Sequence, residues 1–67
     1  MARLRVREVA QSQKMSMAKL SRKADLSIVT IRRIWRNPEY DVSLSTLQKI
    51  ADALGVSVHE LIDNDSP

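Results

Sequence analysis

Residues 17–36 read MAKLSRKADLSIVTIRRIWR and contain two short amphipathic segments. In each segment the apolar residues recur at the spacing of an α-helix, first over residues 17–24 and again over residues 28–36. The linker between them consists only of Asp25, Leu26 and Ser27, which is too short to let the two helices lie antiparallel. Two short helices joined by such a turn form a helix-turn-helix, and we expect this motif to set the arrangement of the other helices.

The flanking sequence predicts further helices and an all-α fold. Apolar residues at 6, 9 and 10 give a first helix one apolar face. The clearest helical period belongs to a fourth helix, whose expected core face consists of Leu44, Leu47, Ile50, Ala51 and Leu54. We predict five helices, over residues of about 4–13, 17–24, 28–36, 44–54 and 58–62, in one domain that spans residues 1–67. Residues 1–4 are expected to form a loose basic lead-in, and residues 63–67 a polar tail.

Local signals mark the ends of these helices. A serine precedes three of them, where its hydroxyl can accept a hydrogen bond from an otherwise unpaired backbone N–H; these N-cap candidates are Ser16, Ser27 and Ser43. Asp25 and Gly55 follow helices at positions where a left-handed backbone is expected. Residues 57–60 read SVHE, the pattern of a capping box, and Pro38 ends the helix before it.

The composition excludes several classes of protein. A chain of 67 residues has room for one small core but not for the layered sheet of most enzymes. It contains no cysteine, one histidine and one glycine, so it offers no thiolate metal site and no glycine-rich phosphate loop. No apolar run approaches the roughly 20 residues that span a bilayer. We therefore expect a cytoplasmic protein that is not an enzyme, binds no cofactor or metal and does not associate with membranes.

Charge is divided unevenly along the chain. Residues 1–36 carry ten lysines and arginines against Glu8 and Asp25, a net charge of +8. Residues 37–67 carry Lys49 against six acids, a net charge of −5, and the two parts sum to the +3 of the whole chain. A basic region beside a helix-turn-helix favours double-stranded DNA as a partner, because the second helix of the motif can enter the major groove. Charge alone is also compatible with solvated helix surfaces or an anionic membrane, but the first helix lacks the aromatic-bearing apolar face of membrane-surface helices.

The chain resembles the Cro/C1 or XRE family of phage and bacterial helix-turn-helix repressors. The resemblance runs from about Val6 to Ile62 and is most specific over residues 16–34 and over SLSTLQKIADALGVSVHELI, residues 43–62. It implies a five-helix, lambda-repressor-like DNA-binding domain with the helix-turn-helix at helices 2 and 3. It also implies a sequence-specific transcriptional regulator, expected to be a repressor, that binds as a homodimer to an operator with two half-sites.

The resemblance also places individual residues near DNA. The predicted base contacts are Ser27, Ile28, Val29, Thr30 and Arg33. The predicted contacts to the DNA backbone are Lys14, Ser16, Met17, Lys19, Arg22, Arg32, Arg36 and Asn37. Isoleucine and valine can contact only thymine methyl groups or exclude mismatched shapes, whereas Arg33 can bind guanine bidentately. A phosphate contact and a solvated side chain are the alternatives for Arg33.

Three positions depart from the family's pattern. Met17 stands where many members have a glutamine, so the hydrogen bond of that glutamine to DNA is missing. Trp35 stands where a glutamate commonly pairs with an arginine of the first helix, and Ala10 stands in place of that arginine. We expect the indole to pack over Ala10 and to replace the ion pair by apolar contact. The alternative is an exposed tryptophan that anchors a partner protein.

Two questions stay open at this point. The first is whether the chain is instead a protein-interaction module of the same fold, such as an antitoxin-like component whose Ile28, Val29 and Trp35 contact protein. The second is how a dimer forms. An apolar surface at Leu54, Val56 and Ile62 is one route, and dimerisation on DNA is the other.

Overall fold

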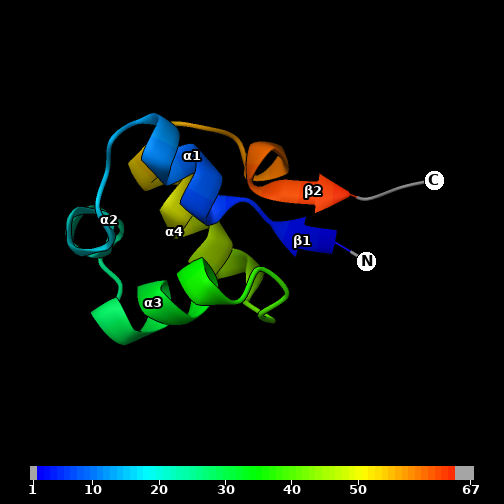
Figure 1. The fold of residues 1–67 in the computed structure, drawn as a ribbon, viewed down its shortest axis with the longest axis horizontal. Helices are drawn as coiled ribbons and strands as arrows, with labels where there is room; N and C mark the ends of the chain where they lie inside the picture. Colours follow the sequence, from blue (N-terminus) through cyan, green and yellow to red (C-terminus); the bar gives the residue numbers. More distant parts are fainter. Residues whose placement is uncertain (1, 65–67) are drawn as a thin grey trace.

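The computed structural model describes residues 2–64, which form four α-helices and a short two-stranded sheet at one end of the molecule (Figure 1). The elements follow in the order β1 (Ala2–Leu4), α1 (Val6–Ser12), α2 (Met17–Ala24), α3 (Ile28–Arg36), α4 (Leu44–Leu54), a 3-10 helix η1 (Val58–Leu61) and β2 (Ile62–Asn64). Helices α2, α3 and α4 span the ranges that the apolar spacing predicts.

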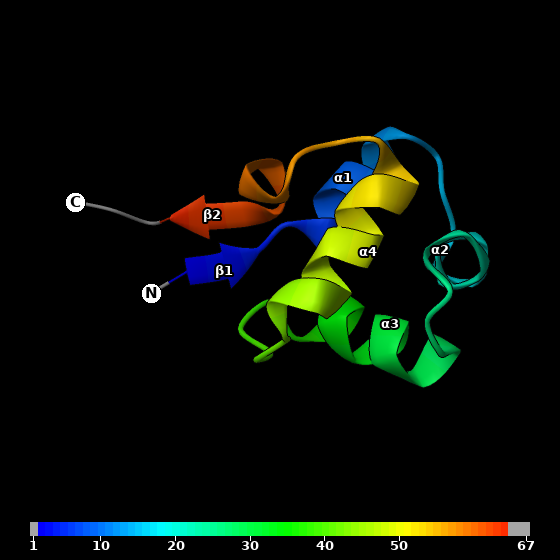
Figure 2. The same cartoon turned by 180° about the vertical axis from the view of Figure 1, so that it is seen from behind.

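The helices are arranged around α4. Helix α2 packs against α3 and α4, and α1 packs against the same two helices. In Figure 1, α2 is seen nearly end-on while α3 lies across the view, so the two helices cross steeply, as expected for a helix-turn-helix. Figure 2 shows from the other side that α2 and the start of α3 lie at one end of the molecule, whereas β1 and β2 lie at the other.

The core lies between the helices and is almost entirely aliphatic. The largest side chains without solvent contact are Leu20, Ile31, Ile34, Ile50, Leu61 and Val6. They come from α1, α2, α3, α4 and η1, so each of these elements contributes to one cluster of buried residues. Because no polar or charged residue among the described ones is buried, this core is held by apolar contact and not by internal ion pairs.

The predicted capping residues are confirmed in detail. The hydroxyls of Ser16, Ser27 and Ser43 accept hydrogen bonds from backbone N–H groups three residues later, at 3.2, 3.1 and 3.2 Å. Asp25 ends α2 in the left-handed region at φ 57° and ψ 46°, and Gly55 ends α4 at φ 69° and ψ 30°. The capping box of residues 57–60 is present. These caps satisfy backbone groups that the helices leave unpaired and so define where each helix begins or ends.

The prediction of five helices is wrong, because residues 2–64 form four. Residues 58–61 form one turn of 3-10 helix, which ends where Ile62 enters β2. The first helix begins at Val6 and not near residue 4. Residues 2–4 are extended because they pair with β2, so the helix cannot begin there. The backbone N–H of Arg5 donates to the carbonyl oxygen of Leu61 at 2.7 Å.

The pairing of β1 with β2 also overturns the expected loose lead-in at residues 2–4 and the expected polar tail at residues 63–64. The strands are antiparallel, with Ala2 opposite Asn64, Arg3 opposite Asp63 and Leu4 opposite Ile62. The backbone N–H of Leu4 also donates to the carbonyl oxygen of Pro38 at 2.7 Å, which ties β1 to the loop after α3. Residue 1 of the expected lead-in and residues 65–67 of the expected tail lie outside the described residues.

Two predictions about apolar side chains are also wrong. Leu44 is 72% exposed although the helical period places it on the core face, because the buried stripe of α4 begins one turn later, at Leu47. Leu54 is only 4% exposed, so it is not available as part of a dimer surface. Val56 and Ile62 are partly buried and pack against the same core. Of the three residues named for one route to a dimer, Leu54 is therefore excluded, whereas Val56 and Ile62 keep part of their surface exposed.

The described part of the chain has neither a membrane-spanning helix nor a cluster of metal ligands. Within residues 2–64 no helix is long and apolar enough to cross a bilayer. The same residues contain no group of three or more histidine, cysteine, aspartate or glutamate side chains that could hold a metal ion.

Candidate nucleic-acid interface

The turn between α2 and α3 is held by a pair of hydrogen bonds. The Ser21 hydroxyl donates to the carbonyl oxygen of Leu26 at 2.5 Å, and the Leu26 N–H donates to the carbonyl oxygen of Ser21 at 3.1 Å. Asp25 makes the reversal between them in its left-handed conformation. Leu26 is partly buried and packs against the core. The direction of α3 relative to α2 is thus fixed by backbone geometry, two hydrogen bonds and one apolar contact.

Helix α3 is strongly amphipathic and carries its charge outward. Ile31 and Ile34 are 0% and 2% exposed, and they anchor the helix in the core. Three consecutive residues, Val29, Thr30 and Ile31, are β-branched and favour helix only weakly, so this burial stabilises the helix where propensity does not. The three arginines of α3, at 32, 33 and 36, are exposed, and the helix contains no acid.

The first turn of α3 presents apolar groups to solvent. Ile28 is 36% exposed and Val29 is 47% exposed, next to each other at the start of the helix. Ser27 and Thr30 flank them, but their hydroxyl oxygens lie 3.0 Å apart and form a hydrogen bond with each other. Of the five predicted base contacts, four therefore form one contiguous turn, and Arg33 follows one turn later.

The end of α3 forms a basic groove. Exposed Arg32, Arg33 and Arg36 line a groove of about 380 Å³ together with Asn37 and Tyr40. The Asn37 side-chain oxygen accepts from the Glu39 N–H at 3.2 Å, and the Asn37 carbonyl oxygen accepts from the Tyr40 N–H at 2.9 Å. This turn places the partly buried phenol ring beside the arginines. Tyr40 is not among the predicted DNA contacts, because a single tyrosine in a polar loop is equally compatible with packing and with a contact to DNA or a partner.

The other predicted backbone contacts lie on and before α2. Lys19 and Arg22 are exposed on α2, and Lys14 lies just before it with a positive φ of 57°. Ser16 is exposed, and its hydroxyl caps α2 by accepting from the Lys19 N–H. Met17 differs from these residues, because its side chain is partly buried and packs against the core.

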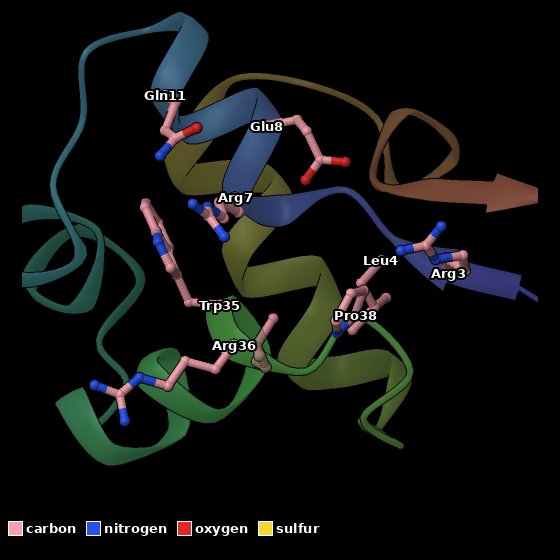
Figure 3. A pocket seen from close by; sticks show the side chains of 9 residues that line it. Arg3, Leu4, Arg7, Glu8, Gln11, Trp35, Arg36 and Pro38 are labelled. Atoms are coloured by element: carbon pink, nitrogen blue, oxygen red, sulfur yellow. The ribbon is translucent and has the colours of Figure 1, made fainter.

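Trp35 faces α1 and not the outward surface of α3. Figure 3 shows the indole rising from α3 toward Arg7 and Gln11 of α1, where these residues line an open hollow of about 390 Å³. The ring is partly buried and packs against the core cluster, to which the fully buried Ala10 also belongs. This agrees with the expected packing role of Trp35 and separates it from the apolar pair at the start of α3.

Comparisons with known proteins agree with a helix-turn-helix formed by α2 and α3. A family model described as the Cro/C1-type HTH DNA-binding domain matches residues 5–65. The search of curated protein sequences gave no match.

Among solved structures, the chain is similar to SinR, named as the master regulator for biofilm formation, in complex with DNA. The TM-score is 0.76 and the identity 29%, over 82% of this chain and 87% of the other. A complex of SinR with SinI gives a TM-score of 0.81 at 30% identity, over 90% of this chain and 58% of the other. A putative DNA-binding protein from Bacteroides fragilis gives 0.82 at 28% identity, over 94% and 100% of the two chains. By its sequence from residue 5 to residue 65 and by its fold, the chain belongs to the family of Cro/C1-type helix-turn-helix DNA-binding domains.

Proposed function

We infer that this protein is a transcriptional repressor that reads a specific DNA sequence by inserting α3 into the major groove. The observation that carries this function is the division of α3 into two faces. Ile31 and Ile34 fix the helix in the core, while all of its charged side chains are arginines that point into solvent. A rigid helix with an outward basic face can enter a groove lined by phosphates without a large conformational change.

The two ends of α3 have different roles in this proposal. The first turn, residues 27–30, and Arg33 contact base edges, since the start of a recognition helix is the part that reaches deepest into the groove. Arg32, Arg36 and Asn37 contact phosphates beyond the groove. The residues that contact phosphates from the α2 side are Lys14, Ser16, Met17, Lys19 and Arg22, of which Met17 contributes only backbone and apolar contact. The likeness to SinR bound to DNA supports this orientation of the motif.

Two copies of the chain bind one operator in this proposal. Each copy places one α3 in one half-site, so the half-site centres are about 34 Å, one turn of DNA, or a multiple of this distance apart. The copies associate on DNA in this proposal, because burial of Leu54 in the core reduces the apolar surface that a free dimer would use.

Binding to a pool of random-sequence duplexes, measured over a series of salt concentrations and followed by sequencing of the bound fraction, tests the proposal. We expect affinity to fall steeply with salt and one two-fold-symmetric site to be enriched. A steep salt dependence without an enriched site would contradict sequence reading. Sedimentation of the protein with and without the enriched duplex then tests association on DNA, with monomers expected in the free protein and two copies on the duplex.

The second candidate function is a protein-interaction module of the same fold. It is favoured by the exposure of Ile28 and Val29 and by the likeness to SinR in its complex with SinI. Trp35 does not support it, because the indole packs against the core. Weak binding to all duplexes even at low salt is the result that would favour this function.

A further inference from the structure

The surface formed by Ile28 and Val29 is unusual for its place in the molecule. Among the described residues, the large apolar side chains that are exposed are Ile28, Val29 and Leu44. Two of these three are neighbours at the start of α3, the part of the helix that the proposed function places deepest in the groove. Their exposure to water is unfavourable in the free protein, so a partner that covers them with an apolar group gains binding free energy.

The two hydroxyls that flank this pair are hydrogen-bonded to each other. The Ser27 hydroxyl accepts from the Thr30 N–H at 3.1 Å and lies 3.0 Å from the Thr30 hydroxyl. The first turn thus presents two branched aliphatic side chains to the edge of a base, and the hydroxyls on either side of them are bonded to each other. Isoleucine and valine are also stiff at χ1, so little side-chain freedom is lost when they are covered.

Of the groups that base pairs present in the major groove, the C5-methyl of thymine is the largest apolar one. We propose that Ile28 and Val29 form a methyl-reading surface that selects operators carrying thymine opposite the first turn of α3 and accepts 5-methylcytosine through the same contact. This inference rests on the proposed function and states which chemical group that function reads.

The position of Arg33 adds a second element to the operator. Val29 and Arg33 are four residues apart on one helix, so their side chains lie on neighbouring turns of the same face, about 6 Å apart along the axis. Since base pairs follow one another every 3.4 Å or so, a guanine read by Arg33 lies about two base pairs from the thymine.

Deoxyuridine provides a direct test, because it pairs like thymidine and keeps the O4 acceptor but lacks the methyl group. In the enriched duplex, each thymine is replaced in turn by deoxyuridine and the dissociation constant is measured. We expect one or two thymines per half-site to lose about fourfold in affinity each, the effect of removing one buried methyl group. At the same positions, duplexes with 5-methylcytosine are expected to bind about fourfold more tightly than duplexes with cytosine.

The variant Ile28→Ala with Val29→Ala links this effect to the two side chains. Both positions are exposed and alanine favours helix more than isoleucine or valine, so the variant is expected to fold, which circular dichroism checks. It should bind thymine and deoxyuridine duplexes equally, with the salt dependence of the original protein. Leu44→Ala, which removes an exposed leucine from α4, is the matched control and should keep the fourfold discrimination.

Each result has a distinct meaning. If a site is enriched but no thymine is sensitive to deoxyuridine, the protein reads DNA and the methyl-reading surface is wrong. The same holds if the discrimination survives unchanged in the double variant, because another residue then contacts the methyl group. If no site is enriched at all, the proposed function fails and the inference fails with it.

Discussion

The hydroxyl of Ser21, in α2, donates a hydrogen bond of 2.5 Å to the carbonyl oxygen of Leu26, in the turn that leads to α3. This bond spans the joint of the helix-turn-helix, and its acceptor is a backbone carbonyl in a partly buried segment. The hydroxyl of Ser21 therefore has a structural role in this joint. It satisfies a carbonyl that the left-handed Asp25 turns away from helical geometry.

Ser21→Ala is expected to lower the free energy of unfolding by about 1 kcal/mol, because the Leu26 carbonyl loses its partner. Urea unfolding followed by the fluorescence of Trp35, the single tryptophan, measures this change. Ser12→Ala is the matched control, since the Ser12 hydroxyl also donates to a backbone carbonyl, that of Val9 at 2.7 Å, but within an exposed helix end. Equal losses for the two variants would contradict a special role of the joint.

Arg33→Ala and Arg32→Ala are neighbouring substitutions on α3 that should act differently. Without Arg33, the preference at one base pair per half-site should relax, with a loss of about 1–3 kcal/mol for the best site. Without Arg32, the same site should be enriched. The plot of log affinity against log salt should become less steep, because its negative slope loses about 0.9 in magnitude for each phosphate that the protein no longer neutralises. Selection from a random pool and a salt series measure both quantities. If the base preference relaxed only in Arg32→Ala, Arg32 and not Arg33 would be the residue that reads a base.

Gly55→Ala is expected to lower the free energy of unfolding by about 1–2 kcal/mol, because residue 55 has φ +69° and an alanine there is strained. A Cβ atom at this position would meet nothing within 4 Å, so the backbone conformation alone accounts for the loss. Gly55→Asn should lose less, since asparagine tolerates the left-handed region better than alanine does. Thermal unfolding followed by circular dichroism measures both variants, and equal losses would argue against conformational strain as the cause.

Trp35→Ala is expected to lower the free energy of unfolding by about 2 kcal/mol, less than the ~3–5 kcal/mol of a fully buried aromatic residue, because the indole is only partly buried. Trp35→Phe should keep most of the packing and lose less. Circular dichroism is the readout, since the fluorescent side chain is removed. Full stability of Trp35→Ala together with loss of binding to a partner protein would instead favour the role of an exposed anchor.

The local features of the fold could be predicted from the sequence because their causes are local. Ser16, Ser27 and Ser43 accept from N–H groups only three residues away, and Gly55 and Asp25 supply the left-handed backbone that the end of a helix requires. The helical apolar spacing over residues 28–36 likewise reflects a buried side of α3, where Ile31 and Ile34 lie in the core.

The features that escaped prediction depend on contacts between distant parts of the chain. Strands of three residues, Ala2–Leu4 and Ile62–Asn64, carry almost no period of their own, and each forms only because the other is present. The helical period places Leu44 on the same face as Leu47, but it does not show where the core ends. The groove beside Arg36 and Tyr40 depends on how the loop after α3 folds, which charge and spacing do not determine.

The antiparallel pairing of β1 with β2 also determines how the protein responds to force. Ala2 lies opposite Asn64 at the outer end of the sheet, and Leu4 lies opposite Ile62 at its inner end. A pull that separates residue 2 from residue 64 therefore loads the paired residues of the two strands one after another, as in a zipper, and not all together as in shear. The sheet should open at low force before the helices do. β1 and β2 lie at the opposite end of the molecule from α2 and the start of α3, so opening the sheet exerts no direct pull on the turn between these two helices.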